Sequence, residues 1–176
     1  MDLESLHQEL VDSSDLLIVQ DLDGVCMPLV KDPLTRSLPA DYVHAAARLR
    51  GNFCVLTNGE HEGHRGVNRL VEKSLGDSSI ARHQGLYLPG LAAGGVQLQD
   101  EFGHLTHPGV SNAEMSFLAS VPERMSSLMS ALLPSVMPDL ADQDLMAEIK
   151  HAILDTQVSP TINLNSLFAR IPDDVA

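Results

Sequence analysis

The sequence predicts an α/β fold: part of a parallel sheet with its helices, followed by a mostly helical region. Two short apolar runs, 16–19 and 53–56, are each closed by polar residues and a glycine. Such runs are typical of fully buried strands in a parallel sheet. Apolar residues at helical spacing occur between them, over 40–49, and after them, over 67–75. From residue 112 onward the apolar spacing is helical throughout.

Composition excludes several functional classes. The chain has 176 residues, 44% of them hydrophobic, which gives room for one domain or one plus part of another. A net charge of −13 and an aromatic content of 3% argue against nucleic-acid binding. No apolar run approaches the roughly 20 residues of a membrane span, and the acidic first residues are unlike a signal peptide. Cys26 and Cys54 are expected to be buried thiols, so we expect a cytoplasmic protein.

The first half of the chain alternates helices with strands. Residues 2–11 are predicted to form a short helix, and a strand follows over 16–19. Pro39 fits the first turn of a second helix, whose buried face is formed by Tyr42, Ala45, Ala46 and Leu49. A second strand spans 53–56. A third helix follows, with Val67, Leu70, Val71 and Leu75 on one face and Gly76 at its end.

The second half begins with a hairpin and then becomes helical. Residues 85–98 are predicted to form a third strand and an antiparallel partner that bends at Gly94 and Gly95. Residues 100–103 form a turn. Helices are expected over 113–133, with a break at Pro122, and then over 139–154 and 163–170.

Two acids follow the first strand directly, in the order Asp21, Leu22, Asp23, Gly24. Ligands bind at this position in open α/β sheets. One interpretation is an ordinary polar turn. A calcium loop with Gly24 at its sixth position would place Val19 first and Val30 twelfth, and neither can ligate calcium. The third interpretation is a nucleophilic carboxylate with an acid/base partner, assisted by a magnesium ion that offsets charge repulsion with a phosphate ester.

The motifs resemble those of the haloacid-dehalogenase (HAD) superfamily of phosphotransferases. Its first motif is an apolar strand followed by Asp-x-Asp-Gly, and its second is an apolar strand ending in Thr or Ser. Here the second motif is the strand 53–56 followed by Thr57, Asn58 and Gly59. Three longer stretches, 17–33, 55–66 and 85–96, resemble the glucosylglycerol-phosphate phosphatases of cyanobacteria. This resemblance extends over most of the chain, from about residue 16 to about residue 167.

The resemblance implies a partial Rossmann-like sheet core over 1–97 and the beginning of an inserted α/β cap over 98–176. It implies that Asp21 attacks phosphorus, that Asp23 acts as general acid and then base, and that Thr57, Asn58 and Gly59 hold the phosphate. Mg²⁺ would bind the Asp21 carboxylate and the Asp23 backbone carbonyl. The substrate would be glucosylglycerol 3-phosphate, and the product, glucosylglycerol, would be a compatible solute under salt stress.

Other charged residues near these motifs are ambiguous. We expect Lys31 and Arg36 to be solvated surface charges rather than substrate contacts. His61 and His64 are expected to be polar loop residues, since zinc would need more ligands at suitable spacing. Arg65 is a candidate phosphate contact.

Two further HAD motifs are not found in the sequence: a catalytic Lys or Arg and a second acidic pair. Lys73, Lys150, the Gly76-Asp77 step and the Asp173-Asp174 pair lie in unsuitable places. Without the remaining core the first strand has an unpaired edge, which predicts self-association or pairing with a missing C-terminal half. One alternative is a truncated, non-catalytic phosphate- or partner-binding fragment. Another is a sucrose- or trehalose-phosphate type of phosphatase.

Overall fold

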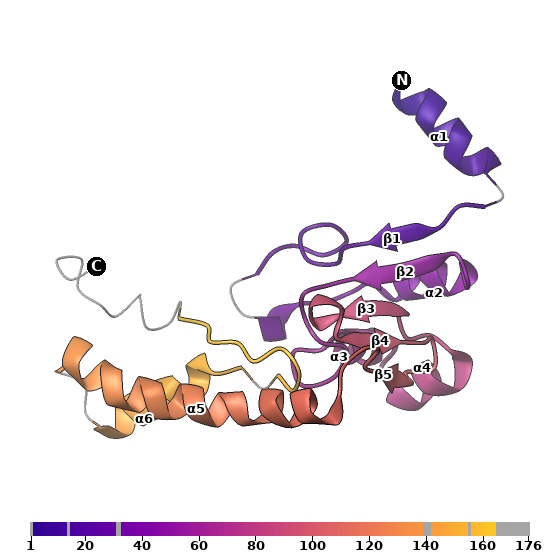
Figure 1. Ribbon diagram of the computed structural model, residues 1–176. Helices are drawn as coiled ribbons and strands as arrows, with labels where there is room; N and C mark the ends of the chain where they lie inside the picture. The colour runs from indigo at the N-terminus through magenta and orange to yellow at the C-terminus, as the bar shows by residue number, and fades with distance from the viewer. Residues whose placement is uncertain (1, 14, 31–32, 139–141, 155, 165–176) are drawn as a thin grey trace. The chain divides into compact units, whose positions relative to one another are not determined.

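The structure is a computed structural model, which describes residues 2–13, 15–30, 33–138, 142–154 and 156–164 (Figure 1). The chain divides into two compact units, Met1–Pro108 and Gly109–Ala176. The first unit contains every strand of the described sheet, and the second is mainly helical.

The first unit contains a five-stranded mixed sheet, which confirms the predicted α/β class. Its strands, in spatial order, are β1 (Ile18–Gln20), β2 (Phe53–Leu56), β3 (Gly90–Ala92), β4 (Gln97–Gln99) and β5 (Leu105–Thr106). β1, β2 and β3 are parallel, and β3, β4 and β5 are antiparallel. The predicted hairpin is therefore present, with the short 3-10 helix η2 (Ala93–Gly95) at its bend. β5 was not predicted.

Three helices pack against the sheet in one hydrophobic core. They are α2 (Ala40–Arg48), α3 (Val67–Leu75) and α4 (Ser78–Gln84). The core joins their apolar side chains to Phe53 and Val55 of β2. α3 ends at Gly76 as predicted, because that glycine adopts the left-handed conformation with φ 73°. Leu49 is 42% exposed, so its assignment to the buried face of α2 was wrong.

The other face of the sheet is apolar and exposed. Strand alternation sends side chains to opposite faces, and the register pairs Val19 with Cys54, Leu56 with Leu91, and Leu91 with Leu98. The exposed fractions on this face are 58% for Leu17, 54% for Val19, 49% for Leu56, 37% for Leu91 and 41% for Leu98. The prediction that the first strand is fully buried was wrong, because β1 buries neither its outer face nor its outer edge.

β1 lies at the edge of the sheet, as expected from the sequence, which predicted an unpaired edge for the first strand. Within the described residues β1 pairs only with β2, and the sheet order places it first. Parallel sheets normally occur with both faces covered. An apolar edge strand with one exposed face is therefore a surface to which another strand or chain can bind.

Two helices lie outside this sheet. α1 (Leu3–Asp12) occupies almost the predicted range and begins at Asp2, whose side chain accepts a hydrogen bond from the Ser5 amide at 2.7 Å. None of its residues is buried. The short 3-10 helix η1 (Pro33–Thr35) lies between β1 and α2.

Both cysteines are free thiols, and neither is fully buried. Cys26 lies in the turn after β1, and Cys54 lies in β2. Partial burial raises the pKa of the Cys26 thiol. The expectation that both cysteines are buried was wrong.

The second unit is built on a long helix, α5 (Asn112–Val136), which packs against α6 (Asp142–Ala152). α5 begins with a capping box in which Ser111 and Glu114 bond to each other's backbone amides. Pro122 and Pro134 both lie inside this helix, so the predicted break at Pro122 was wrong. The core of the unit contains Met129, Met137, Leu145, Ile149 and Ala152. Of the helix predicted over 163–170, Asn163 and Leu164 are not helical, and 165–170 lie outside the described residues.

The first compact unit continues past residue 97, the end predicted for the core, because β4 and β5 pair onto β3. The assignment of the second region to a cap stays a prediction. Among the described helices, none is long and apolar enough to span a bilayer.

Candidate active site

Asp21 and Asp23 lie on a tight turn directly after β1. Leu22, between them, is fully buried and anchors the turn. Its carbonyl accepts hydrogen bonds from the amides of Cys26 (3.2 Å) and Met27 (3.3 Å). Gly24 adopts φ 82°, which a side chain would disfavour, and its amide donates to the Met27 carbonyl at 2.8 Å. The two carboxylates are therefore presented by an ordered backbone.

The carboxylates have different surroundings. Asp21 is exposed, and its Oδ1 accepts a hydrogen bond from the Leu22 amide at 2.8 Å. Asp23 is 34% exposed, and both of its carboxylate oxygens accept from Arg36 Nη1, at 3.2 Å and 3.0 Å. One acid is therefore open to a ligand, while the other is held by a cation.

The loop after β2 contains the predicted phosphate-binding residues. β1 and β2 are parallel and pair Gln20 with Val55, so both loops begin at the same edge of the sheet. The Thr57 amide donates to the Leu91 carbonyl at 3.0 Å, and the Ala93 amide donates to the Gly59 carbonyl at 2.7 Å. These bonds fix the loop to the end of β3.

The donors of this loop are not equally available. Thr57 is 4% exposed, and its Oγ1 accepts from the Gly59 amide at 3.3 Å. Within the described part of the chain, the Thr57 hydroxyl hydrogen and the Asn58 amide have no acceptor. These two groups can therefore donate to phosphate oxygens, whereas the Gly59 amide is already occupied.

Arg36 was missed as a site residue. It was expected to be a solvated surface charge, but its side chain is only 8% exposed and contacts Asp23. Its Nη2 also donates to the backbone carbonyl of Arg65, a residue predicted as a phosphate contact. No local pattern distinguishes Arg36, because it lies in a short polar segment that resembles a surface loop.

His61 was expected to be a polar loop residue, but in the structure its side chain supports the loop after β2. Its side chain is fully buried, and its Nε2 contacts the Gly90 carbonyl of β3 at 3.0 Å. A carbonyl can only accept, so Nε2 must bear the hydrogen. Nδ1 is then the unprotonated nitrogen, and it has no partner among the described residues. The His61 amide donates to Gln97 Oε1 at 2.8 Å.

We predict that acid destabilises the first unit through His61. Burial lowers the pKa of this imidazole below the 6.5 of an unfolded histidine. The unfolded chain therefore gains a proton first as the pH falls below 6.5, and stability falls by up to about 1.4 kcal/mol per pH unit until the folded form also protonates. Above pH 6.5 the contribution is constant. Urea unfolding at pH 7.5 and 5.5 measures this loss.

The substitution His61→Gln should reduce the difference in stability between the two pH values, because glutamine can donate to Gly90 but does not titrate. His44→Gln, at an exposed histidine of α2, should leave the difference unchanged. An equal pH dependence in wild type and His61→Gln would contradict the prediction.

The described residues contain no group of three or more His, Cys, Asp or Glu side chains that could hold a metal ion. Lys73 is an exposed residue in the last turn of α3. The pair Asp173-Asp174 lies outside the described residues, as does Lys31.

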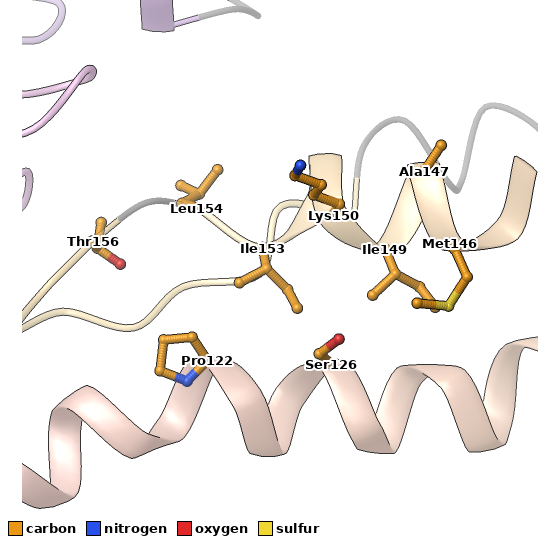
Figure 2. A pocket seen from close by; sticks show the side chains of 9 residues that line it. All are labelled: Pro122, Ser126, Met146, Ala147, Ile149, Lys150, Ile153, Leu154 and Thr156. Atoms are coloured by element: carbon orange, nitrogen blue, oxygen red, sulfur yellow. The ribbon is translucent and has the colours of Figure 1, made fainter. Parts of the chain in front are cut away.

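A pocket of about 730 Å³ lies within the second unit, between α5, α6 and the segment after α6 (Figure 2). Its lining residues are Pro122, Ser126, Met146, Ala147, Ile149, Lys150, Ile153, Leu154 and Thr156. Lys150 is the one charged residue in this lining. A sugar phosphate needs many polar partners, so this mainly apolar pocket does not fit such a ligand.

Comparison with known proteins agrees with the resemblance seen in the motifs. A sequence profile described as glucosylglycerol-phosphate phosphatase matches residues 15–176. A curated protein named glucosylglycerol-phosphate phosphatase, from Synechocystis sp. (strain ATCC 27184 / PCC 6803 / Kazusa), is 49% identical over 173 residues. The alignment covers 98% of this chain but 41% of that relative, so the chain spans about two fifths of the relative's length.

Proposed function

The chain belongs to the glucosylglycerol-phosphate phosphatase family, and we propose that it hydrolyses glucosylglycerol 3-phosphate to glucosylglycerol and phosphate. One observation supports this most strongly. The parallel pairing of β1 with β2 places the acidic turn and the Thr57 loop at the same edge of the sheet. An exposed carboxylate and free hydrogen-bond donors there match the needs of phosphoryl transfer.

In this proposal Asp21 is the nucleophile. Its exposed carboxylate attacks phosphorus, so that a bond forms between a carboxylate oxygen and phosphorus while the bond to the glycerol oxygen breaks. Asp23, once protonated, donates its proton to that leaving oxygen. It then takes a proton from water, whose oxygen attacks the aspartyl-phosphate and releases inorganic phosphate.

The Thr57 hydroxyl and the Asn58 amide donate to the phosphate oxygens. Gly59 contributes by orienting the Thr57 side chain, because its amide donates a hydrogen bond to Thr57 Oγ1. These fixed donors act locally, which matters because a net charge of −13 otherwise repels an anionic substrate.

We include Mg²⁺ in the proposal. Within the described residues, the second carboxylate oxygen of Asp21 and the backbone carbonyl of Asp23 accept no hydrogen bond. Magnesium commonly binds one or two protein oxygens together with substrate phosphate and water, so these two groups fit it. When bound, the ion would offset the repulsion between the carboxylates and the phosphate ester.

The test is magnesium-dependent phosphate release by the 176-residue chain. Glucosylglycerol phosphate should be hydrolysed at least tenfold faster than sucrose phosphate or trehalose phosphate, each at the same concentration. Faster hydrolysis of another sugar phosphate would support phosphomonoester hydrolysis but reject glucosylglycerol phosphate as the substrate. Absence of turnover from folded protein would overturn the proposal for this chain alone.

A second candidate function is a non-catalytic phosphate-binding or partner-binding module. It is favoured by one observation: the described residues contain no group of three or more His, Cys, Asp or Glu side chains that could hold a metal ion, so Asp21 and Asp23 have no third acidic ligand there. Binding of inorganic phosphate without turnover would support this candidate. A cytoplasmic location is part of either proposal, and the free thiols support it.

We also propose that the chain associates with another polypeptide, either a second copy or a chain that supplies further strands. The support is the open edge of β1 and the apolar sheet face formed by Leu17, Val19, Leu56, Leu91 and Leu98. Sedimentation at micromolar concentration should show species larger than a 19.0 kDa monomer.

Val19→Lys should shift this distribution toward monomer, because it places a charge on the exposed face next to the open edge. Leu3→Lys, at an 84% exposed position of α1, should not. A wild-type chain that is monomeric and thermally stable would contradict the association.

A further inference from the structure

Arg36 links the two loops that form the candidate site. Its guanidinium donates through Nη1 to both carboxylate oxygens of Asp23, and through Nη2 to the backbone carbonyl of Arg65. Asp23 belongs to the turn after β1, and Arg65 belongs to the loop after β2. One side chain therefore joins two segments that are far apart in the sequence and that follow paired strands of the sheet.

Each of the joined segments is internally ordered. The turn containing Asp23 is closed by the bond from the Gly24 amide to the Met27 carbonyl, at 2.8 Å. The loop containing Arg65 is closed by bonds from the Val67 amide to the Glu60 carbonyl (3.0 Å) and from the Asn68 amide to the His61 carbonyl (2.9 Å). Because each segment is closed by its own backbone hydrogen bonds, a contact between them constrains the position of one relative to the other.

The burial of Arg36 argues against direct substrate binding. Its side chain is 8% exposed, and two of its nitrogens are already engaged with the protein. A planar guanidinium with several fixed donors can hold a carboxylate and a carbonyl at the same time, whereas an ammonium group cannot reproduce that geometry.

We propose that Arg36 is the positioning residue of Asp23: it fixes the orientation of that carboxylate and its placement relative to the loop after β2. The proposal rests on the proposed function, since it assigns Arg36 an effect on the proton-transfer step of that reaction. The effect passes through Asp23, so Arg36 should matter only while the Asp23 carboxyl is present.

The kinetic test uses magnesium-dependent phosphate release by the full chain. Arg36→Gln should lower kcat by about 10- to 100-fold with less than a threefold change in KM, because a misplaced acid impairs chemistry more than binding. Arg36→Lys should recover only a small part of the loss. Arg48→Gln, at an exposed arginine in the last turn of α2, should change neither constant.

A double variant separates positioning from general support of the fold. In an Asp23→Ala background, Arg36→Gln should cause no further loss of kcat. An equal additional loss in that background, or a loss expressed mainly in KM, would overturn the proposal.

If the wild-type chain shows no turnover, the proposed function fails for this chain. Urea unfolding then tests the contact between Arg36 and Asp23 independently of activity. Asp23→Ala leaves the buried Arg36 guanidinium without its carboxylate, and Arg36→Gln leaves the partly exposed Asp23 carboxylate without its cation. The double variant should therefore lose less stability than the sum of the two single variants. If the stability losses of Asp23→Ala and Arg36→Gln simply add in the double variant, the two side chains do not interact and the proposal is overturned.

Discussion

Asp21→Asn is expected to lower phosphate release by about 10⁴- to 10⁶-fold, the range seen when a nucleophile or its essential partner is removed from a hydrolase. The amide of asparagine cannot form the aspartyl-phosphate, whereas its size and hydrogen-bonding to the Leu22 amide are nearly unchanged. The fold should therefore remain intact. The measurement is phosphate release at saturating magnesium, with circular dichroism to verify folding.

Asp15→Asn is the matched control for this substitution. It removes the same charge from an exposed carboxylate on the other side of β1, so it should retain wild-type turnover. Retention of turnover in Asp21→Asn would show that another group attacks phosphorus.

Gly90→Ala is expected to destabilise the first unit by at least about 3 kcal/mol. Gly90 pairs with Val55 across β2 and β3 at φ 138°, and a Cβ atom there would collide with the Val55 carbonyl oxygen and lie 2.6 Å from its nitrogen. Backbone cannot move aside as a flexible side chain can, so the two strands must separate. The loss would appear as a lower urea midpoint.

Gly94→Ala provides the control for backbone strain alone. Gly94 also has a positive φ, 64°, but an added Cβ meets no atom within 4 Å. Its cost should be about 1 kcal/mol, the penalty of the left-handed conformation. If Gly90→Ala and Gly94→Ala lose equal stability, the close approach of β2 and β3 at Gly90 is not the cause of the loss.

The elements with strong local patterns were predicted from the sequence. β2 and α3 have the predicted bounds, since an apolar run before Thr57 and a helical stripe closed by Gly76 leave few alternatives. α4 was missed because Ala81 is its one fully buried residue, which leaves almost no apolar periodicity. α5 continues through Pro122 although a proline inside a helix removes one backbone hydrogen bond. The packing of α5 against α6, which local sequence rules do not include, offsets this cost.

The residues of the candidate site also differ in how far local sequence patterns predict them. Asp21 and Thr57 were predicted as site residues because each directly follows a strand, and Asp23 because it lies in the same turn as Asp21; parallel pairing brings these positions to one edge of the sheet. Arg36 and His61 were misjudged because burial of a polar side chain depends on distant partners: Asp23 for one, and Gly90 for the other. Such long-range pairs leave no periodic signal in the chain.

The parallel pairing of β1 with β2 also has a consequence for biosynthesis. Both halves of the candidate site, the turn at Asp21 and the loop at Thr57, lie within the first 59 residues, yet they meet only when these two strands pair in register. Non-local parallel pairing forms slowly because a long segment must be closed first. During synthesis, α2 leaves the ribosome before β2 and can hold the intervening segment compact. The candidate site at this edge of the sheet is therefore completed only after the crossover helix α2 has formed.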